Sequence, residues 1–66
     1  YKRQILCDPP YGYLGHDRLA AYLPRALAPD GVLVYETGSR EEPAIEGLST
    51  RTSRTYGSAR LTLFQH

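Results

Sequence analysis

Two runs of apolar residues predict strands. Residues 3–7 are apolar on both faces, which is typical of a parallel strand covered on two sides. Pro9 ends this run, because proline has no N–H for a sheet ladder. Val32-Leu33-Val34-Tyr35 is continuous and rich in β-branched residues, as in a buried central strand. We therefore expect both runs inside one sheet.

Between these runs, apolar side chains recur at the spacing of one helix face. They are Leu19, Tyr22, Leu23, Ala26 and Leu27. Pro24 conflicts with this pattern, because it deletes a hydrogen bond and crowds the carbonyl group of Ala20. We expect a kinked helix, or one that stops near Leu23, and then a turn at Pro29-Asp30-Gly31.

The last third of the chain predicts an antiparallel hairpin. A polar loop, Thr37–Gly47, precedes a Thr-rich segment, Ser49–Tyr56, and Gly57-Ser58 can turn the chain. The residues that follow alternate, with Ala59, Leu61 and Leu63 on one side and Arg60, Thr62 and Phe64 on the other.

The order strand, helix, strand, hairpin defines the expected fold class. A helical crossover joins two parallel strands with a right-handed turn. We therefore expect an α/β fold, the C-terminal half of an open Rossmann-like sheet, with strand–helix–strand followed by the hairpin. Ligands of such sheets bind beyond the carboxyl ends of the strands, where Asp8 and Glu36 stand in the sequence.

The length of 66 residues allows at most one small domain. A domain of this size buries only about 60% of the surface of its unfolded chain, so its stability is marginal. The chain contains no Met, and we expect residues 1–66 to be a fragment of one domain. No apolar run is long enough to span a membrane, and no signal-peptide pattern occurs, so we expect no membrane partner. The single Cys7 is compatible with a reducing cytoplasm.

The net charge of +1 conceals an uneven distribution. Acidic residues dominate from Glu36 to Glu46, whereas Arg51, Arg54 and Arg60 stand unopposed after them. One interpretation is a solvated polar strand. The other is a surface that faces phosphate groups, to which Arg supplies charge and paired hydrogen bonds. The second interpretation predicts RNA contacts at Arg51 and Arg54.

The clearest chemistry lies in Asp8-Pro9-Pro10-Tyr11. A residue that precedes proline is held extended, and both prolines have a fixed φ. Neither proline has an N–H, and an ionised carboxylate only accepts hydrogen bonds. The Asp8 side chain and the Pro9 carbonyl can therefore receive both hydrogens of one NH2 group, while Tyr11 stacks on a flat ring. A turn that merely ends the strand is the alternative interpretation.

Such a rigid pair of acceptors suits the methylation of an aromatic amino group. The lone pair of that nitrogen is delocalised into the ring, and acceptors placed off the ring plane favour a tetrahedral, more nucleophilic nitrogen. Preorganised acceptors need no reordering when the substrate arrives. A base inside a helix must be extruded or unpaired to reach such a pocket.

These elements resemble the C-terminal part of a class I S-adenosylmethionine-dependent methyltransferase, of the branch that methylates amino groups with an Asn/Asp-Pro-Pro-Tyr/Phe motif. More closely, the chain is similar to the family that methylates guanine N2 in bacterial small-subunit ribosomal RNA. In that family a helix leads from the motif to a strand that ends in Glu, and a hairpin closes the domain. The matching segments are Asp8-Pro9-Pro10-Tyr11, residues 19–27, residues 31–36, and residues 54–57 leading into residues 61–64.

The resemblance implies roles for individual residues. Asp8 and Pro9 would be the catalytic residues that hold the amino group, and Asp8 would also contact the cofactor. At the substrate-binding positions, Tyr11 would stack on the base and Pro10 would shape the loop. Tyr13 is a further candidate for substrate binding, and the alternative is that it covers the start of the helix. The methyl donor would be S-adenosyl-L-methionine, and most of its site would lie in a first half of the domain that this chain lacks. The implied partner is ribosomal RNA or an assembly intermediate of the small subunit, in the cytoplasm.

Other functions stay open at this point. The same acceptors serve any planar NH2 group, so the substrate can also be adenine or cytosine in DNA, or a glutamine in a protein. A non-catalytic RNA-binding module is the alternative from a different class, and the role of Glu36 is open. We expect the isolated chain to be inactive and to self-associate, because the strand at residues 3–7 would be an unpaired edge.

Overall fold

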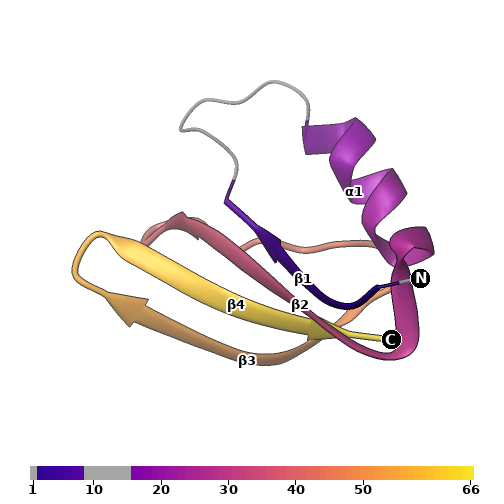
Figure 1. Ribbon diagram of the computed structural model, residues 1–66. Coiled ribbons are helices and arrows are strands. Elements are labelled where there is room, and N and C mark those ends of the chain that lie inside the picture. The colour runs from indigo at the N-terminus through magenta and orange to yellow at the C-terminus, as the bar shows by residue number, and fades with distance from the viewer. Residues whose placement is uncertain (1, 9–15) are drawn as a thin grey trace.

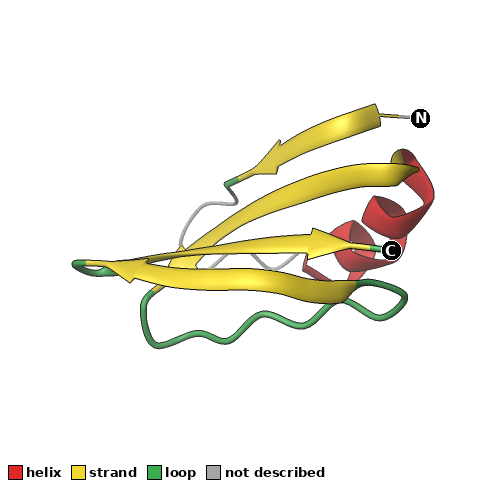
Figure 2. Ribbon diagram, turned by 90° about the horizontal axis from the view of Figure 1, so that it is seen from below, coloured by secondary structure: helices red, strands yellow, loops and turns green. Residues whose placement is uncertain are grey.

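The structure is a computed structural model, which describes residues 2–8 and 16–66 (Figure 1). A parallel pair begins the sheet, and an antiparallel hairpin completes it, in the order β1-β2-β4-β3 (Figure 2). One helix, α1, lies against one face. The elements are β1 (Lys2–Cys7), α1 (His16–Ala26), β2 (Leu27–Gly38), β3 (Ser49–Tyr56) and β4 (Ala59–Gln65).

The element-by-element predictions are largely confirmed. β1 and β2 pair in parallel, with Leu6 opposite Val34 and Cys7 opposite Tyr35. β2 pairs antiparallel with β4, and β4 with β3. The turn between β3 and β4 contains Gly57 at a φ of 59°, a left-handed conformation that glycine adopts at little cost. The apolar run of β2 therefore forms the central strand, paired on both sides.

The predicted fold class is wrong. A Rossmann-like half-sheet consists of parallel strands covered by helices on both faces. Here two of the three strand pairings are antiparallel, because β4 lies between β2 and β3. The described residues contain one helix of 11 residues against strands of 6, 12, 8 and 7 residues. The fold is a small mixed sheet, and the apolar run of β2 fits an antiparallel neighbour as well as a parallel one.

The helix also differs from its prediction. It continues past Pro24 to Ala26, and β2 begins at the next residue. Leu27, expected on the helix, is the first residue of β2 and is 1% exposed, whereas Tyr22 is 62% exposed. The apolar spacing therefore predicts correctly that Leu19 and Leu23 face the core, but it wrongly predicts the same for Tyr22.

The predicted turn at Pro29-Asp30-Gly31 lies within β2 as an irregularity. Lys2 pairs with Leu27 but Gln4 pairs with Val32, so β2 carries extra residues between the two pairs. Gly31 fits here because a Cβ at this position would come within 2.9 Å of the Arg3 carbonyl oxygen and 2.7 Å of Leu27 Cδ1. Close backbone approach, and not a positive φ, therefore requires glycine at this position.

The core lies between α1 and one face of the sheet, which we call the covered face. Leu33 pairs with Phe64, and Tyr35 pairs with Thr62, so these four buried side chains share that face. The Tyr35 and Phe64 rings meet edge to face, with centroids 6.3 Å apart and planes at 87°. Buried side chains from outside the sheet's centre complete the core: Leu23, Leu27 and Ile45.

The opposite side, which we call the open face, carries the other alternating residues. Its central side chains are half-buried: Val32, Val34, Leu61 and Leu63. On β1, which is an edge strand as expected for this chain, the side chain of Leu6 is 74% exposed. No helix of the described residues covers the open face (Figures 1 and 2). The predicted alternation along β4 is confirmed. Thr62 and Phe64 are buried, whereas Leu61 and Leu63 lie on the open face.

Candidate functional site

Asp8 lies directly after the last residue of β1 and is exposed. Because Cys7 pairs with Tyr35, the position level with Asp8 on the neighbouring strand is Glu36. Asp8 thus follows the end of β1 at the level of Glu36, whereas the sequence prediction places both acids at the carboxyl ends of their strands. β2 continues to Gly38, so Glu36 stands two residues before the strand end instead of at it.

Residues that lie level with one another on neighbouring strands form a row across the sheet. The row that starts at Asp8 and Glu36 continues to an arginine. Glu36 pairs with Leu61, and Leu61 pairs with Arg54, which is exposed. Residues directly opposite each other in a sheet point to the same face, here the open face. Adjacent strands are about 4.8 Å apart, so the backbones at Asp8 and Arg54 are separated by three strand spacings, about 14 Å. The row therefore places a carboxylate and a guanidinium at one end of one sheet.

Arg51 occupies a different position. Thr50 pairs with Phe64 and Thr52 with Leu63, so Arg51 is the extra residue of a β-bulge in β3. Its side chain is exposed. Both arginines predicted to contact RNA are accessible, but only Arg54 stands in the row with Glu36.

Four of the predicted site residues lie outside the described residues: Pro9, Pro10, Tyr11 and Tyr13. The predicted pair of acceptors on Asp8 and Pro9 and the stacking of Tyr11 therefore stay predictions.

Among the described residues, Cys7 is a titratable group whose environment shifts its pKa. Burial raises the pKa of its thiol above the ordinary value of 9.0, and the nearby Asp8 carboxylate raises it further. Both effects disfavour the thiolate, which is the nucleophilic form. Cys7 is a half-buried side chain packed against the core rather than a reactive thiol, as the sequence indicates.

Arg60 has a structural role that the sequence does not reveal. Its Nε and Nη2 donate to the Ser39 carbonyl oxygen at 3.3 and 3.0 Å, and its Nη1 donates to Ser53 Oγ at 3.0 Å. The Ser39 amide in turn donates to the Ser58 carbonyl at 2.8 Å. Arg60 thus ties the loop after β2 to the hairpin and differs from the exposed Arg51 and Arg54. Only the pairing register brings these groups together.

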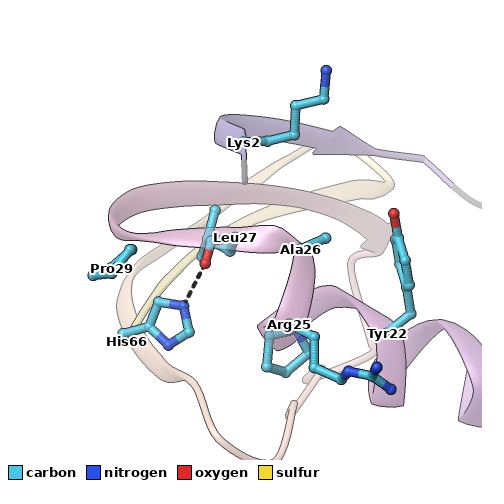
Figure 3. Close-up of a pocket in the computed structure, with 8 residues that line it drawn as sticks. Lys2, Tyr22, Arg25, Ala26, Leu27, Pro29 and His66 are labelled. Atoms are coloured by element: carbon cyan, nitrogen blue, oxygen red, sulfur yellow. Dashed lines mark hydrogen bonds between the residues drawn. The ribbon is translucent and has the colours of Figure 1, made fainter.

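A hollow of about 950 Å³ lies at the opposite end of β1, where β2 begins (Figure 3). The residues that line it are Lys2, Tyr22, Pro24, Arg25, Ala26, Leu27, Pro29 and His66. His66 Nε2 donates to the Leu27 carbonyl oxygen at 2.9 Å. The side chains of Lys2 and Arg25 point away from each other (Figure 3), so its basic groups do not converge on one ligand. This hollow is separate from the row that contains Asp8.

Binding of S-adenosylmethionine stays a prediction. Asp8 is the described residue that the resemblance assigns to the cofactor, and a single exposed carboxylate cannot enclose a molecule of that size. Within residues 2–8 and 16–66, no three or more His, Cys, Asp or Glu side chains are grouped as a metal site would need. Over the same residues, no helix has the length and apolarity to cross a membrane.

No protein-family model matches the chain, and no curated protein matches it either. The methyltransferase resemblance therefore rests on the motif and the order of elements alone.

Proposed function

We propose that this chain supplies the amino-group-binding residues of an S-adenosylmethionine-dependent N-methyltransferase. Its substrate is the exocyclic N2 of a guanine in small-subunit ribosomal RNA, and it acts in the cytoplasm. The observation that supports the proposal most is the position of Asp8, an exposed carboxylate at the carboxyl end of a strand in a parallel pair. An exposed carboxylate at this position can accept hydrogen bonds from the NH2 group of a substrate.

Asp8 acts as a fixed acceptor. Its carboxylate receives a hydrogen from the NH2 group, and the Pro9 carbonyl receives the other, which favours a tetrahedral nitrogen whose lone pair is no longer delocalised into the ring. No step is assigned to the methyl donor, because the described residues do not enclose it. Arg54, in the row that begins beside Asp8, binds an RNA phosphate by charge and hydrogen bonds.

The experiment compares Asp8→Ala with Glu42→Ala in the full-length protein, on naked small-subunit ribosomal RNA and on assembly intermediates. Glu42 is an exposed acid in the loop after β2, so its removal changes the net charge equally. We expect Asp8→Ala to lower methyl transfer about a hundredfold or more while RNA binding persists. We expect Glu42→Ala to leave methyl transfer unchanged.

Two results would contradict the proposal. Unchanged methyl transfer by Asp8→Ala would remove the role of the carboxylate. A wild-type protein that binds the RNA but transfers no methyl group to RNA, DNA or protein would favour a non-catalytic RNA-binding module. Transfer to DNA adenine, DNA cytosine or a protein glutamine, lost in Asp8→Ala, would keep the role of Asp8 and replace the substrate.

A further inference from the structure

The sheet has two edge strands, β1 and β3, and they differ in how they are protected from other strands. An edge strand presents unpaired N–H and C=O groups, which can pair with another chain unless charge, a bulge or cover prevents it. None of the described residues pairs with the outer edge of either strand.

β3 carries two of these protective features. The bulge at Arg51 interrupts its ladder. Two exposed arginines, Arg51 and Arg54, also place charge on this strand, which disfavours pairing with another edge. The edge at β3 is therefore protected against pairing with its own copy.

The charges of β1 differ in sign between its two ends, whereas those of β3 are both positive. It begins with Lys2 and Arg3, and the acidic Asp8 follows its last residue. Arg3 is already paired with Asp30 of its own chain, at 2.8 Å. Lys2 and Asp8 are both exposed, at opposite ends of β1, whose pairing with β2 shifts register between Lys2 and Gln4. A strand with one basic and one acidic end is complementary to an antiparallel copy of itself.

We propose that a second copy of this chain pairs antiparallel with β1 about a two-fold axis at Ile5. The two sheets then form one continuous sheet. A two-fold axis perpendicular to the sheet requires the paired residues to share a face, which excludes every register that opposes an odd-numbered with an even-numbered residue. Among the remaining registers, the one centred on Ile5 pairs all of residues 2–8 and sets Lys2 opposite Asp8 twice.

The exposed Leu6 gains from the same register. It lies opposite Gln4 of the second copy and diagonal to the second Leu6, within reach of long side chains. A single pair of edge strands buries little surface, so the dimer dissociates on dilution. The dimer engages the same Asp8 carboxylate that the proposed function assigns to the amino group, but oligomeric state is measured without methyl transfer, so the two proposals can fail separately.

The first test reverses charges in the 66-residue chain and follows its mass by analytical ultracentrifugation. Lys2→Glu and Asp8→Lys each create like-charge pairs and should raise the dimer dissociation constant about tenfold. The double variant Lys2→Glu/Asp8→Lys should restore the wild-type value. Arg40→Glu and Glu42→Lys change the same charges on exposed residues outside the strands and should have no effect. A wild-type chain that stays monomeric, or a double variant no better than the single ones, overturns the proposal.

The second test fixes the register by disulfide formation in a Cys7→Ser background. Directly opposite residues have Cα atoms about 4.5–5.5 Å apart, which a disulfide can span. Ile5→Cys should therefore form a linked dimer under mild oxidation. Leu6→Cys is the control, because its diagonal partner lies about 7–8 Å away. A linked dimer from Leu6→Cys but not from Ile5→Cys overturns the assigned register.

Discussion

The covered and open faces of the sheet are made by the same strands but differ in what they do. On the covered face of β2 and β4, the central side chains are at most 6% exposed: Leu33, Tyr35, Thr62 and Phe64. On the open face of the same strands, the apolar side chains are only half-buried, and Leu6 on β1 is largely exposed. Stability therefore resides on one face, and the accessible row with Glu36 and Arg54 lies on the other.

The largest difference between the faces should appear on truncation of Phe64. Phe→Ala in a core costs about 3–5 kcal/mol, and a chain of this size has a total stability of about 3–10 kcal/mol. We expect Phe64→Ala to be largely unfolded in urea titrations followed by circular dichroism. Leu63 is the next residue along β4 and lies on the open face. Leu63→Ala should lower the free energy of unfolding by about 1 kcal/mol, because less of the Leu63 surface leaves water on folding. Equal losses from the two variants would refute the assignment of the faces.

The next effect concerns the close approach at Gly31. A Cβ here would meet the Arg3 carbonyl oxygen and Leu27, and overpacking of this kind costs about 1–3 kcal/mol. Gly38→Ala is the matched control, because its added Cβ would meet nothing closer than Glu41 Oε1 at 3.8 Å. Gly31→Ala should therefore lower the thermal midpoint and Gly38→Ala should not. If the two variants have the same thermal midpoint, β2 does not approach β1 this closely.

Arg60 and Arg54 should differ in how much each contributes to the unfolding free energy. Arg60 holds the loop at Ser39, so Arg60→Ala should lower the unfolding free energy by about 1 kcal/mol. Arg54→Ala should lie within about 0.5 kcal/mol of the wild type, but should weaken RNA binding of the full-length protein and reduce its salt dependence. Stability and filter-binding measurements on the two variants check this. Loss of RNA affinity in Arg60→Ala alone would reverse the roles assigned to the two arginines.

The smallest effect is the pH dependence of Cys7. Because its pKa is raised in the folded state, the protonated thiol contributes stability at neutral pH, and this contribution is lost as the pH rises through the raised value. Iodoacetamide should label Cys7 slowly until the pH passes 9.0. Leu6→Cys in a Cys7→Ser background should react at lower pH, because residue 6 is exposed on the open face. Equal labelling of both thiols at every pH would contradict the burial of Cys7.

Local patterns predicted the strands and the hairpin, and failed where tertiary pairing decides. The β-branched run of β2 and the alternation in β4 determine strands whatever lies beside them. The sequence could not show that β4 would lie between β2 and β3, nor that the buried side of β4 carries Thr62 instead of the leucines. Thr62 is accommodated because its hydroxyl lies 3.3 Å from Ser53 Oγ, a contact that depends on the register.

The candidate site was predicted in part for the same reason. The position of Asp8 follows from the strand that precedes it, and its place beside Glu36 follows from parallel pairing. The row that reaches Arg54 depends on two antiparallel registers, and the bulge at Arg51 depends on a single extra residue. Neither the row to Arg54 nor the bulge at Arg51 can be predicted from a single sequence, because no local pattern encodes a pairing register.

The central claim is that Asp8 binds an exocyclic amino group, and the most direct test replaces that group alone. Inosine is guanosine without the N2 amino group. Once methylation mapping has located the target nucleotide, fluorescence anisotropy can compare RNAs with guanosine or inosine at that position. The full-length protein should bind the guanosine RNA about tenfold more tightly, because inosine leaves the acceptor unpaired, and Asp8→Ala should remove the difference. Equal affinity of the wild-type protein for the two RNAs would contradict the account.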